Sequence, residues 1–439
     1  MPRQALTFTL FAAAAALAAG LAAAAPAPAA GGPRTYTLVE SWPEHTVLDL
    51  PSVPDAPDVW VAAIAGAARR VDLAGFYFSR KGDGTDAPGP ESAPDRLLPV
   101  LGALEDAAGR GVAVRLLADA KFARTYPEVP AWAGTLPGAQ SRRLDVGRTW
   151  GGVLHAKYFL ADDDALYVGS QNFDWRALGE IHEMGILVRD ATLAAQARRI
   201  FDLDWRLAGQ QADSTAAGGQ DAPSAAVPAP SAPAARLADL PAVTLTGPEG
   251  QSVRAVLAAS PPAGLPEGVP WDLPLLVEMM DAARDSVHVQ LLSYGVSDRD
   301  GRQFDDLDAA LRRAAARGAK VRIILSDWAA TKYALPCIQA LSAVPGIEVR
   351  FTHIPPHPDG FIAFARVEHA KYLTVDGNAM WVGTSNWSRD YFHESRNLGV
   401  FLRGDGATRQ ADAFFNLSWR GPYAEKVTPE GHYAAPKRN

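Results

Sequence analysis

Along this chain, segments whose hydrophobic residues have the spacing of a helix alternate with short apolar runs typical of strands. Residues 58–70 (DVWVAAIAGAARR) have the spacing of a helix, and residues 71–79 (VDLAGFYFS) form a short apolar run typical of a buried strand. A second helix is predicted over residues 95–109 and a second strand over residues 112–118. Strands that alternate with helices indicate an α/β fold with a mixed or parallel sheet.

The same order of elements returns in the second half of the chain. The pattern there predicts helices over 275–284 and 307–317 and strands over 287–294 and 320–326. In each half the second helix ends at an Arg-Gly pair, first at Gly111 and then at Gly318. A glycine after the last turn is an ordinary helix end, but its recurrence in register indicates a duplicated architecture.

A segment of low hydrophobic content separates the two halves. Residues 210–235 are rich in Pro, Ala, Ser and Gly and lack the apolar side chains that would pack against a core. We therefore expect a first lobe over residues 35–210, a linker over residues 211–240 and a second lobe over residues 241–430.

The N-terminus has the pattern of an export signal. Arg3 precedes an uncharged run of Ala and Leu, which ends in small residues that offer Ala-x-Ala cleavage sites between Ala24 and Ala30. The run is long enough to cross a bilayer, so an uncleaved anchor is the alternative. Because alanine is a weak membrane residue and no cationic stop follows, we expect a cleaved signal peptide over residues 1–30 and an exported protein, periplasmic or extracellular.

The net charge and the cysteine count argue against some classes of function. The net charge of the 439 residues is −7, which argues against a protein that binds duplex DNA stably through a broad basic surface. It does not exclude a phosphate substrate, because binding depends on local charge. The single cysteine, Cys337, excludes an intrachain disulfide and argues against a zinc–thiolate site.

Two blocks of sequence carry the candidate chemistry. Each contains His-x-Lys-x4-Asp, then Gly-Ser/Thr-x-Asn, then a His-Glu pair. The first block supplies His155, Lys157, Asp162, Asn172 and Glu183, and the second supplies His369, Lys371, Asp376, Asn386 and Glu394. Two chance copies of the first motif in matching halves are expected in about one of ten thousand chains of this composition.

The spacing within each block predicts a hairpin. Because side chains alternate along a strand, the His and Lys of each motif should project from one face. The turn follows at Asp162 or Asp376, which we interpret as structural residues that hold the hairpin. A returning strand should bring polar side chains back to the His-Lys pair, namely Ser170 and Asn172, or Ser385 and Asn386.

Two such hairpins facing each other would surround one small volume. One imidazole can attack phosphorus and form a covalent phosphohistidine, while the other donates a proton to the leaving oxygen. The lysines and asparagines would neutralise the non-bridging oxygens, so neither a metal ion nor another cofactor is needed. A carboxylate on the far nitrogen of each histidine would hold its tautomer, and Glu183 and Glu394 are the candidates.

On these residues the chain resembles the phospholipase D superfamily. The segments LVESWPE, GVLHAKY, GSQNFDWRAL and VGTSNWSRDYF are most similar to animal lysosomal phospholipase-D-like proteins, which act as single-strand 5′-exonucleases and in lysosomal lipid synthesis. The similarity covers most of residues 35–425. It implies two α/β lobes related by pseudo-twofold symmetry, each a mixed sheet flanked by helices, with one active site at their interface. It also implies His155 as the nucleophile, His369 as the acid and base, and a homodimer.

Other residues carry weaker signals. His182 and His393, each followed by Glu, lack the second histidine of a zinc-binding HExxH helix. His353 and His357 lie in a Pro-rich loop, and we interpret them as surface residues. The alternative is that they line the active-site cleft. Four aromatic residues near the motifs could stack on bases or contact acyl chains, or could belong to the core: Trp150, Trp387, Tyr77 and Tyr294.

The sequence therefore predicts a secreted phosphodiesterase that acts on the 5′ ends of single-stranded nucleic acid. The alternative substrate is a phospholipid, in a hydrolytic or head-group-transfer reaction. A third hypothesis, a binding protein on an inactive enzyme scaffold, is disfavoured because both motifs are intact.

Overall fold

The computed structural model describes residues 32–85, 89–216, 236–297 and 301–439. The predicted export signal and most of the predicted linker lie outside these residues. The first six residues of that linker are helical, because α5 (Ala191–Ala216) continues beyond the predicted boundary. The side-chain amide of Gln211 holds this last part of the helix in place, because it exchanges hydrogen bonds of 2.9 Å with the backbone N–H and carbonyl of Asp145.

One mixed sheet of 16 strands runs through both halves of the chain. The first half contributes, in spatial order, β1 (Thr35–Ser41), β9 (Glu183–Arg189), β7 (Ala165–Gly169), β6 (Tyr158–Ala161), β2 (Arg70–Gly75), β4 (Ala113–Asp119) and β5 (Gln140–Leu144). The second half repeats this order with β11 (Ser252–Ser260), β17 (Asn397–Arg403), β16 (Ala379–Gly383), β15 (Tyr372–Val375), β12 (Ser286–Leu291), β13 (Lys320–Ser326) and β14 (Ile347–Thr352), and adds β18 (Ala424–Lys426). The short strand β10 (Val243–Thr246) joins the halves between β1 and β11. The predicted duplicated α/β fold is confirmed.

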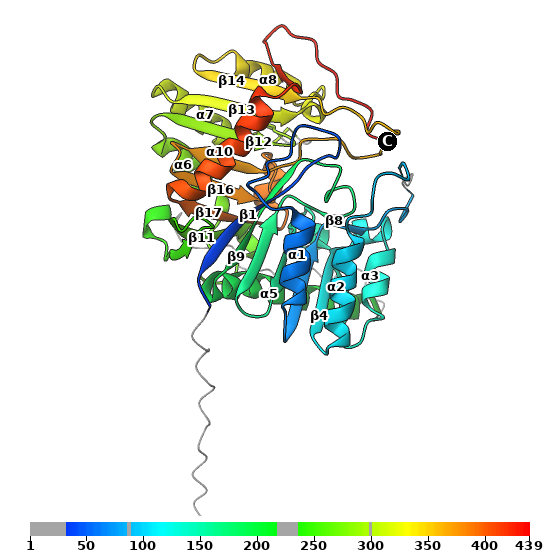
Figure 1. Ribbon diagram of the computed structural model, residues 1–439. Helices are drawn as coiled ribbons and strands as arrows, with labels where there is room; N and C mark the ends of the chain where they lie inside the picture. The colour runs from blue at the N-terminus through cyan, green and yellow to red at the C-terminus, as the bar shows by residue number, and fades with distance from the viewer. Residues whose placement is uncertain (1–31, 86–88, 217–235, 298–300) are drawn as a thin grey trace, which may run out of the picture. The chain divides into compact units, whose positions relative to one another are not determined.

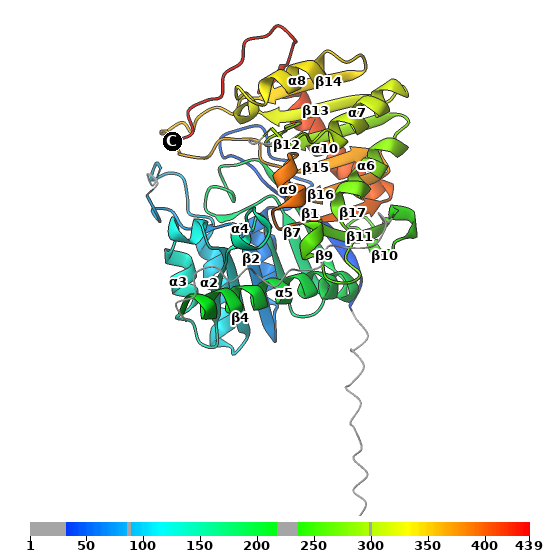
Figure 2. The same cartoon turned by 180° about the vertical axis from the view of Figure 1, so that it is seen from behind.

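Helices cover both faces of this sheet. On the first half, α1 (Ala56–Ala65), α2 (Leu98–Gly109) and α3 (Glu128–Ala133) lie side by side, and α6 (Asp272–Ala282), α7 (Asp306–Ala316) and α8 (Leu335–Ser342) do so on the second (Figure 1). The long helix α5 crosses the opposite face of the first half (Figure 2), and α10 (Asp405–Arg420) packs on the second. Among the described residues no helix is both long and apolar enough to cross a bilayer.

Alternation along the strands divides the apolar residues among three cores. In β6, Tyr158 and Leu160 face a central core with α5 and α10, whereas Phe159 and Ala161 face an outer core with α1 and α2. The second half has its own outer core under α6 and α7. The central core holds residues of both halves, so burial of apolar surface there stabilises their association.

One predicted strand is interrupted where it reaches the candidate site. The run over residues 71–79 divides into β2, which ends at Gly75, and β3 (Phe78–Ser79), which pairs with β8 (Phe173–Asp174) in a separate small sheet. A Cβ atom at Gly75 would lie 2.7 Å from the Phe173 ring. The chain leaves the sheet at this close approach, and the next two side chains line the cavity described below.

The two halves also exchange backbone hydrogen bonds at the motifs. The His155 amide donates to the carbonyl of Arg396 at 3.0 Å, and the His369 amide donates to the carbonyl of His182 at 2.9 Å. In return, the amides of Arg396 and His182 donate to the segments just before the motifs. Each motif is therefore held by the opposite half of the molecule.

Candidate active site

The two His-x-Lys segments lie just before strands β6 and β15. Each segment is extended, but it is not part of a regular ladder, in contrast to the prediction, because its histidine amide bonds to the opposite half. The Lys157 carbonyl accepts from the Gly169 amide at 3.1 Å, and the Lys371 carbonyl from Gly383 at 3.0 Å. The predicted hairpins therefore close at the lysines and leave the histidines free to reach the interface.

The two histidines have different partners. The Nδ1 of His369 lies 2.8 Å from both carboxylate oxygens of Glu183, which belongs to the other half. The Nδ1 of His155 lies 3.1 Å from the amide oxygen of Asn397, again across the interface. In each case Nδ1 is occupied, so Nε2 is the nitrogen that can face a substrate.

The prediction that Glu394 holds a histidine is wrong. Its carboxylate is partly exposed and pairs with Arg389 at 2.6 Å and Arg302 at 2.9 Å. The strand register explains the error. In the first half the equivalent strand, β9, begins at Glu183, whereas in the second half β17 begins at Asn397, so Asn397 takes the place of Glu183. The matching His-Glu dipeptides in the two halves are therefore not structural equivalents.

A similar shift affects the predicted serine pair. The Ser170 hydroxyl exchanges hydrogen bonds of 3.0 Å with the backbone of Met184, and Thr384 makes the matching contact to the Leu398 amide at 3.1 Å. The Thr384 hydroxyl also donates to the amide oxygen of Asn397 at 2.8 Å. Thr384, not Ser385, therefore corresponds to Ser170, since Ser385 is buried without a hydrogen-bond partner among the described residues.

Both asparagines of the motifs reach the shared site. Asn172 and Asn386 line the same cavity, and the Asn172 amide donates to the Tyr77 hydroxyl at 3.4 Å. The buried amide oxygens of both have no hydrogen-bond partner among the described residues. Buried polar groups are normally satisfied, so these oxygens are available to a hydrogen-bond donor of a ligand, whereas the amide N–H groups are the donors that a phosphoryl oxygen would need.

The two lysines are the strongest electrostatic feature of the site. Lys157 and Lys371 are completely buried, and each ammonium donates to the carbonyl of its own motif histidine, at 2.5 and 2.6 Å. Among the described residues neither has a carboxylate within 4 Å. Burial lowers the pKa of Lys371 to about 7 despite the opposing charges of Glu183 and Glu368. Burial and the charge of Lys371 also hold the pKa of Lys157 well below its usual value. Buried ammonium groups without a direct ion-pair partner favour a bound anion.

The remaining titratable groups respond to the same burial and charge. Burial raises the pKa of Glu183 to about 8, although both lysines oppose the shift. Burial, followed by the charges of the lysines, lowers the pKa of His155 and His369 well below the ordinary value. The Glu183–His369 pair is therefore the place where a proton is retained at neutral pH, whereas His155 is neutral there.

Asp162 and Asp376 lie away from the histidines, at the turns. The Asp162 carboxylate accepts hydrogen bonds from the backbone amides of residues 68, 69 and 70 at 2.8 to 3.0 Å. Asp376 accepts from the amides of residues 284, 285 and 286 at 2.8 to 2.9 Å. Each carboxylate ties its hairpin to the start of the neighbouring strand, β2 or β12.

The four catalytic candidates His155, Asn172, His369 and Asn386 line one cavity of about 260 Å³. Its walls are mainly aromatic: Phe76, Tyr77, Phe122, Tyr126, Trp328, Phe364 and Tyr391. The His155 ring lies between Phe76 and Tyr391, at centroid distances of 5.1 and 4.7 Å. The sequence singles out only Tyr77 among them, since the other wall residues belong to separate short helices and loops without a shared motif.

The other predicted aromatic residues lie elsewhere. Trp387 and Tyr294 are buried in the outer core of the second half, where the Tyr294 hydroxyl bonds to Asp308 at 2.5 Å. Trp150 packs under the Arg396 guanidinium, 4.5 Å from the ring centroid. These three residues support the fold rather than the cavity.

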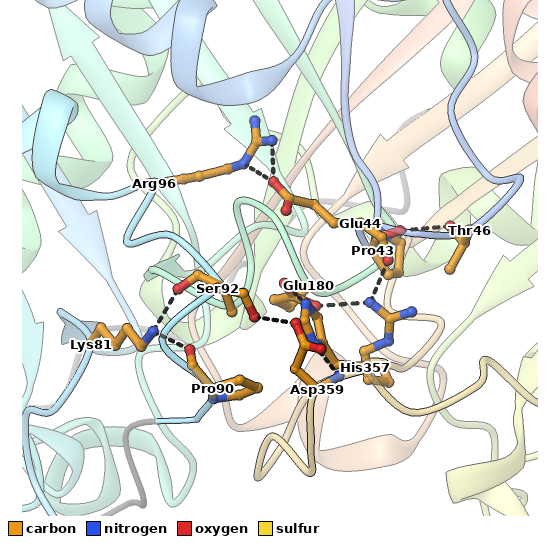
Figure 3. Close-up of polar contacts among 12 residues, drawn as sticks. Pro43, Glu44, Thr46, Lys81, Pro90, Ser92, Arg96, Glu180, His357 and Asp359 are labelled. Atoms are coloured by element: carbon orange, nitrogen blue, oxygen red, sulfur yellow. Dashed lines mark hydrogen bonds and ion pairs between the residues drawn. The ribbon is translucent and has the colours of Figure 1, made fainter.

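The loop before the second motif is fastened to the first half. Arg366 donates to the Glu180 carboxylate at 2.9 Å and to the Glu44 carbonyl at 2.7 Å. Asp359 accepts from the Ser92 hydroxyl at 2.6 Å (Figure 3). His357 is buried in this network, whereas His353 is exposed beside Asp327 and Glu425, so neither lines the cavity. The network holds Phe364 at the cavity wall.

No group of three or more His, Cys, Asp or Glu side chains suited to a metal ion occurs in the described part of the chain. The arrangement is instead two histidines and two amides around one cavity, with a buried ammonium group bonded to the carbonyl of each histidine. These groups can bind and transfer a phosphoryl group, and they define a two-lobed phosphodiesterase.

Comparison with known proteins agrees with this class. The family model described as cardiolipin synthase, PLD-like domain, matches residues 60–205 and 276–419, one segment in each half. The chain belongs to the phospholipase D superfamily and is a phosphoric diester hydrolase. Its relatives include the human protein named 5′-3′ exonuclease PLD3, 30% identical over 416 residues, which cover 89% of this chain and 80% of the relative.

Other relatives carry other names. Phospholipase D Z of Dictyostelium discoideum is 29% identical over 413 residues, covering 89% of this chain and 90% of that protein. Among solved structures, a phosphatidylserine synthase from Haemophilus influenzae aligns with a TM-score of 0.56 at 12% identity, over 90% of this chain and 87% of that one. At that identity the likeness concerns the fold alone.

Proposed function

We propose that this protein is an exported phosphodiesterase that removes nucleotides from the 5′ ends of single-stranded nucleic acid through a phosphohistidine. The observation that carries the proposal is an aromatic-walled cavity lined by two motif histidines, with a buried lysine bonded to the carbonyl of each histidine. The buried lysines favour an anion, and the aromatic walls suit an unpaired base.

The proposed reaction has two steps. In the first, Nε2 of His155 forms a bond to phosphorus, the bond to the leaving oxygen breaks, and His369 gives its proton to that oxygen. In the second, water attacks phosphorus, His369 takes the proton of the water, and the bond to His155 breaks. Lys157, Lys371 and the two amides neutralise the phosphoryl oxygens in both steps.

The partners of the histidines support this division of roles. His369 lies against Glu183, and because burial raises the pKa of Glu183 to about 8, the pair keeps at neutral pH the proton that a general acid needs, although burial lowers the pKa of His369 itself. His155 lies against a neutral amide and near both lysines, which favours the unprotonated imidazole that a nucleophile needs. Trapping with substrate at low pH and peptide mass mapping should place the phosphoryl group on residue 155.

The shape and lining of the cavity favour a strand end over a duplex. A volume of about 260 Å³ holds one nucleotide-sized group at most. Tyr77 and Tyr126 are stacked at 5.1 Å on one wall, and Trp328 and Phe364 lie on the cavity lining contributed by the second half. Base stacking on aromatic rings contributes about 1–3 kcal/mol per base and tolerates any sequence.

One observation favours the alternative, a phospholipid substrate. Phe361, in the apolar loop over residues 360–365, is 49% exposed, and the Lys437 ammonium lies 5.3 Å from its ring. An exposed aromatic side chain beside a cation can insert at a lipid surface. We rank this function second because Phe361 does not line the catalytic cavity.

A parallel activity screen tests the substrate and the metal requirement. Linear single-stranded DNA and RNA with 5′-hydroxyl ends should be degraded, and EDTA should leave the rate unchanged. Circular single strands and blunt duplexes should resist, because neither offers an unpaired end. Turnover of phosphatidylcholine without any nuclease activity would establish the lipid function instead. Rapid cleavage of circles would exclude the end-specific reaction.

Export and self-association are further parts of the proposal. The pattern of residues 1–30 supports cleavage between Ala24 and Ala30, and mass spectrometry of the secreted protein should find a new N-terminus there. A homodimer rests on the family resemblance alone, and light scattering on the mature protein measures it directly.

A further inference from the structure

A second hollow lies in the first half, at the open edge of the sheet. Its volume is about 1090 Å³, several times that of the catalytic cavity. Strand β5 ends the sheet, so no described strand pairs with its outer edge. Residues of α3, α4 (Val146–Trp150) and the end of α5 form the walls, and all three helices are labelled in Figure 2. We call this hollow the β5 groove.

The β5 groove is cationic in a chain whose net charge is −7. Four arginines line it, namely Arg124, Arg142, Arg143 and Arg148, against two carboxylates, Asp145 and Asp213. Arg142 is held in place by Trp205, which lies 4.5 Å below its guanidinium and accepts its hydrogen bond at 2.8 Å. The side chains of Arg124, Arg143 and Arg148 are exposed and form no ion pair with any described residue. Three neighbouring unpaired guanidinium groups are a site for a polyanion.

The groove adjoins the catalytic cavity through one short segment. Phe122, the first residue of the 3-10 helix η1 (Phe122–Arg124), and Tyr126, which follows this helix, line the catalytic cavity. Lys121 and Arg124, from the same segment, are exposed, and Arg124 lines the β5 groove. One face of this segment therefore offers rings to a base, and the other offers cations to phosphates.

We propose that the β5 groove binds the phosphate backbone of a single strand whose 5′ end occupies the catalytic cavity. This inference rests on the proposed function and adds a second binding surface that lengthens the recognised strand. A concave surface suits a flexible chain of phosphates better than a flat bilayer. The exposed large hydrophobic side chains of the described residues, Val47, Leu98, Tyr333 and Phe361, all lie outside the groove. A membrane-binding surface would be expected to include such side chains.

Binding of labelled oligonucleotides to the full chain tests the groove. The double variant Arg143→Ala/Arg148→Ala, in a His369→Ala background that prevents degradation, should bind a 25-nucleotide single strand about tenfold more weakly than the background. The slope of log K against log salt should fall by about 1.4, which is about 0.7 for each phosphate of a single strand that the variant no longer neutralises. A tetranucleotide should bind both proteins equally, because it does not reach the groove.

Matched variants separate the groove from general charge and from folding. Arg284→Ala/Arg420→Ala removes two exposed arginines of the second half that have no described partner, and its affinity and slope should equal those of the background. Arg143→Lys/Arg148→Lys should keep the slope. With His369 intact, Arg143→Ala/Arg148→Ala should hydrolyse bis(p-nitrophenyl) phosphate at the native rate, which shows that it is folded.

Each other outcome overturns the inference in a recognisable way. An unchanged slope and affinity in a protein that degrades single strands would exclude the groove and leave the proposed function intact. Failure of the background protein to bind single strands at all would exclude both. Weaker binding of the double variant to phosphatidylserine vesicles, but not to the oligonucleotide, would make the groove a membrane-binding surface. An equal loss in Arg284→Ala/Arg420→Ala would assign the effect to net charge.

Discussion

Glu183 and Asn397 occupy equivalent places in the two halves, but only Glu183 can bind and release a proton. Each begins the strand that follows the motif and reaches the Nδ1 of the histidine of the other half. A duplicated scaffold would otherwise make the two histidines alike. This one difference places a titratable carboxyl beside His369 and a neutral amide beside His155, which suits a reaction with a separate nucleophile and acid.

Glu183→Gln should therefore reduce kcat by about a hundredfold, because a general acid that loses its carboxylate loses much of its driving force. Glu394→Gln should reduce kcat less than about threefold, since that carboxylate only pairs with Arg302 and Arg389 at the surface. Steady-state rates on a linear single strand measure both. Equal losses in the two variants would contradict the assignment of partners.

The pH profile of kcat should be asymmetric. The lowered pKa of His155 keeps the nucleophile neutral below its usual range, so activity should persist at pH values under 6.5. The proton of the Glu183–His369 pair is kept up to about pH 8, the raised pKa of Glu183, and the Lys371 ammonium up to about pH 7, so kcat should fall on the alkaline side as both are lost. Glu183→Gln should change this alkaline limb alone. A profile whose acidic limb responds to this variant would reverse the two roles.

At the scale of elements, the hairpins are anchored by their turn carboxylates. Although burial alone would raise it, the pKa of Asp162 is lowered by hydrogen bonds from the amides of Ala68, Arg70 and Arg69. A carboxylate with a lowered pKa stabilises the fold at pH values above its unfolded pKa, near 3.9. That stabilisation is lost as the pH falls through the lower pKa of the folded state.

Asp162→Asn should lower the free energy of unfolding at pH 7 by about 1–2 kcal/mol, because an amide cannot accept all three backbone bonds. Its difference from the native protein should shrink as the pH falls below about 4. Urea denaturation at several pH values measures this. Asp164→Asn is the control, since the Asp164 side chain has no described hydrogen bond or ion pair, and a similar loss there would refute the anchor.

At the scale of the molecule, the active site exists only where the halves meet. Buried pairs join them on both sides of the site: Arg396 with Asp204 at 2.8 Å, and His182 with Glu368 at 2.8 Å. Each motif histidine takes both its backbone and its side-chain partner from the opposite half. The geometry therefore requires both halves for one catalytic event.

His155→Ala and His369→Ala should each reduce turnover at least about a thousandfold, because the two residues have different tasks in one reaction. The double variant should be little worse than either single one, as expected for groups that act as a unit. Near-native thermal melting of each variant is the control for folding. Half of the native rate in either single variant would indicate two independent sites.

The local sequence was enough to predict much of this arrangement. The periods of the apolar residues predicted β13 to the residue, and the four predicted helices correspond to α1, α2, α6 and α7 with ends that differ by at most five residues. These elements depend on near neighbours along the chain, so their pattern is readable without the fold. The motif pair predicted which histidines, lysines and asparagines meet, because its spacing sets the order of each hairpin.

What the sequence could not determine are the contacts made across the duplicate halves. Glu394 was chosen because it follows a histidine as Glu183 does, but only the register of β17 shows that Asn397 takes that place. Likewise Tyr126, Trp328 and Phe364 come from separate loops and meet only at the cavity. Local periodicity carries no information about which distant side chains a shared interface will bury, and this part of the site was decided by tertiary packing alone.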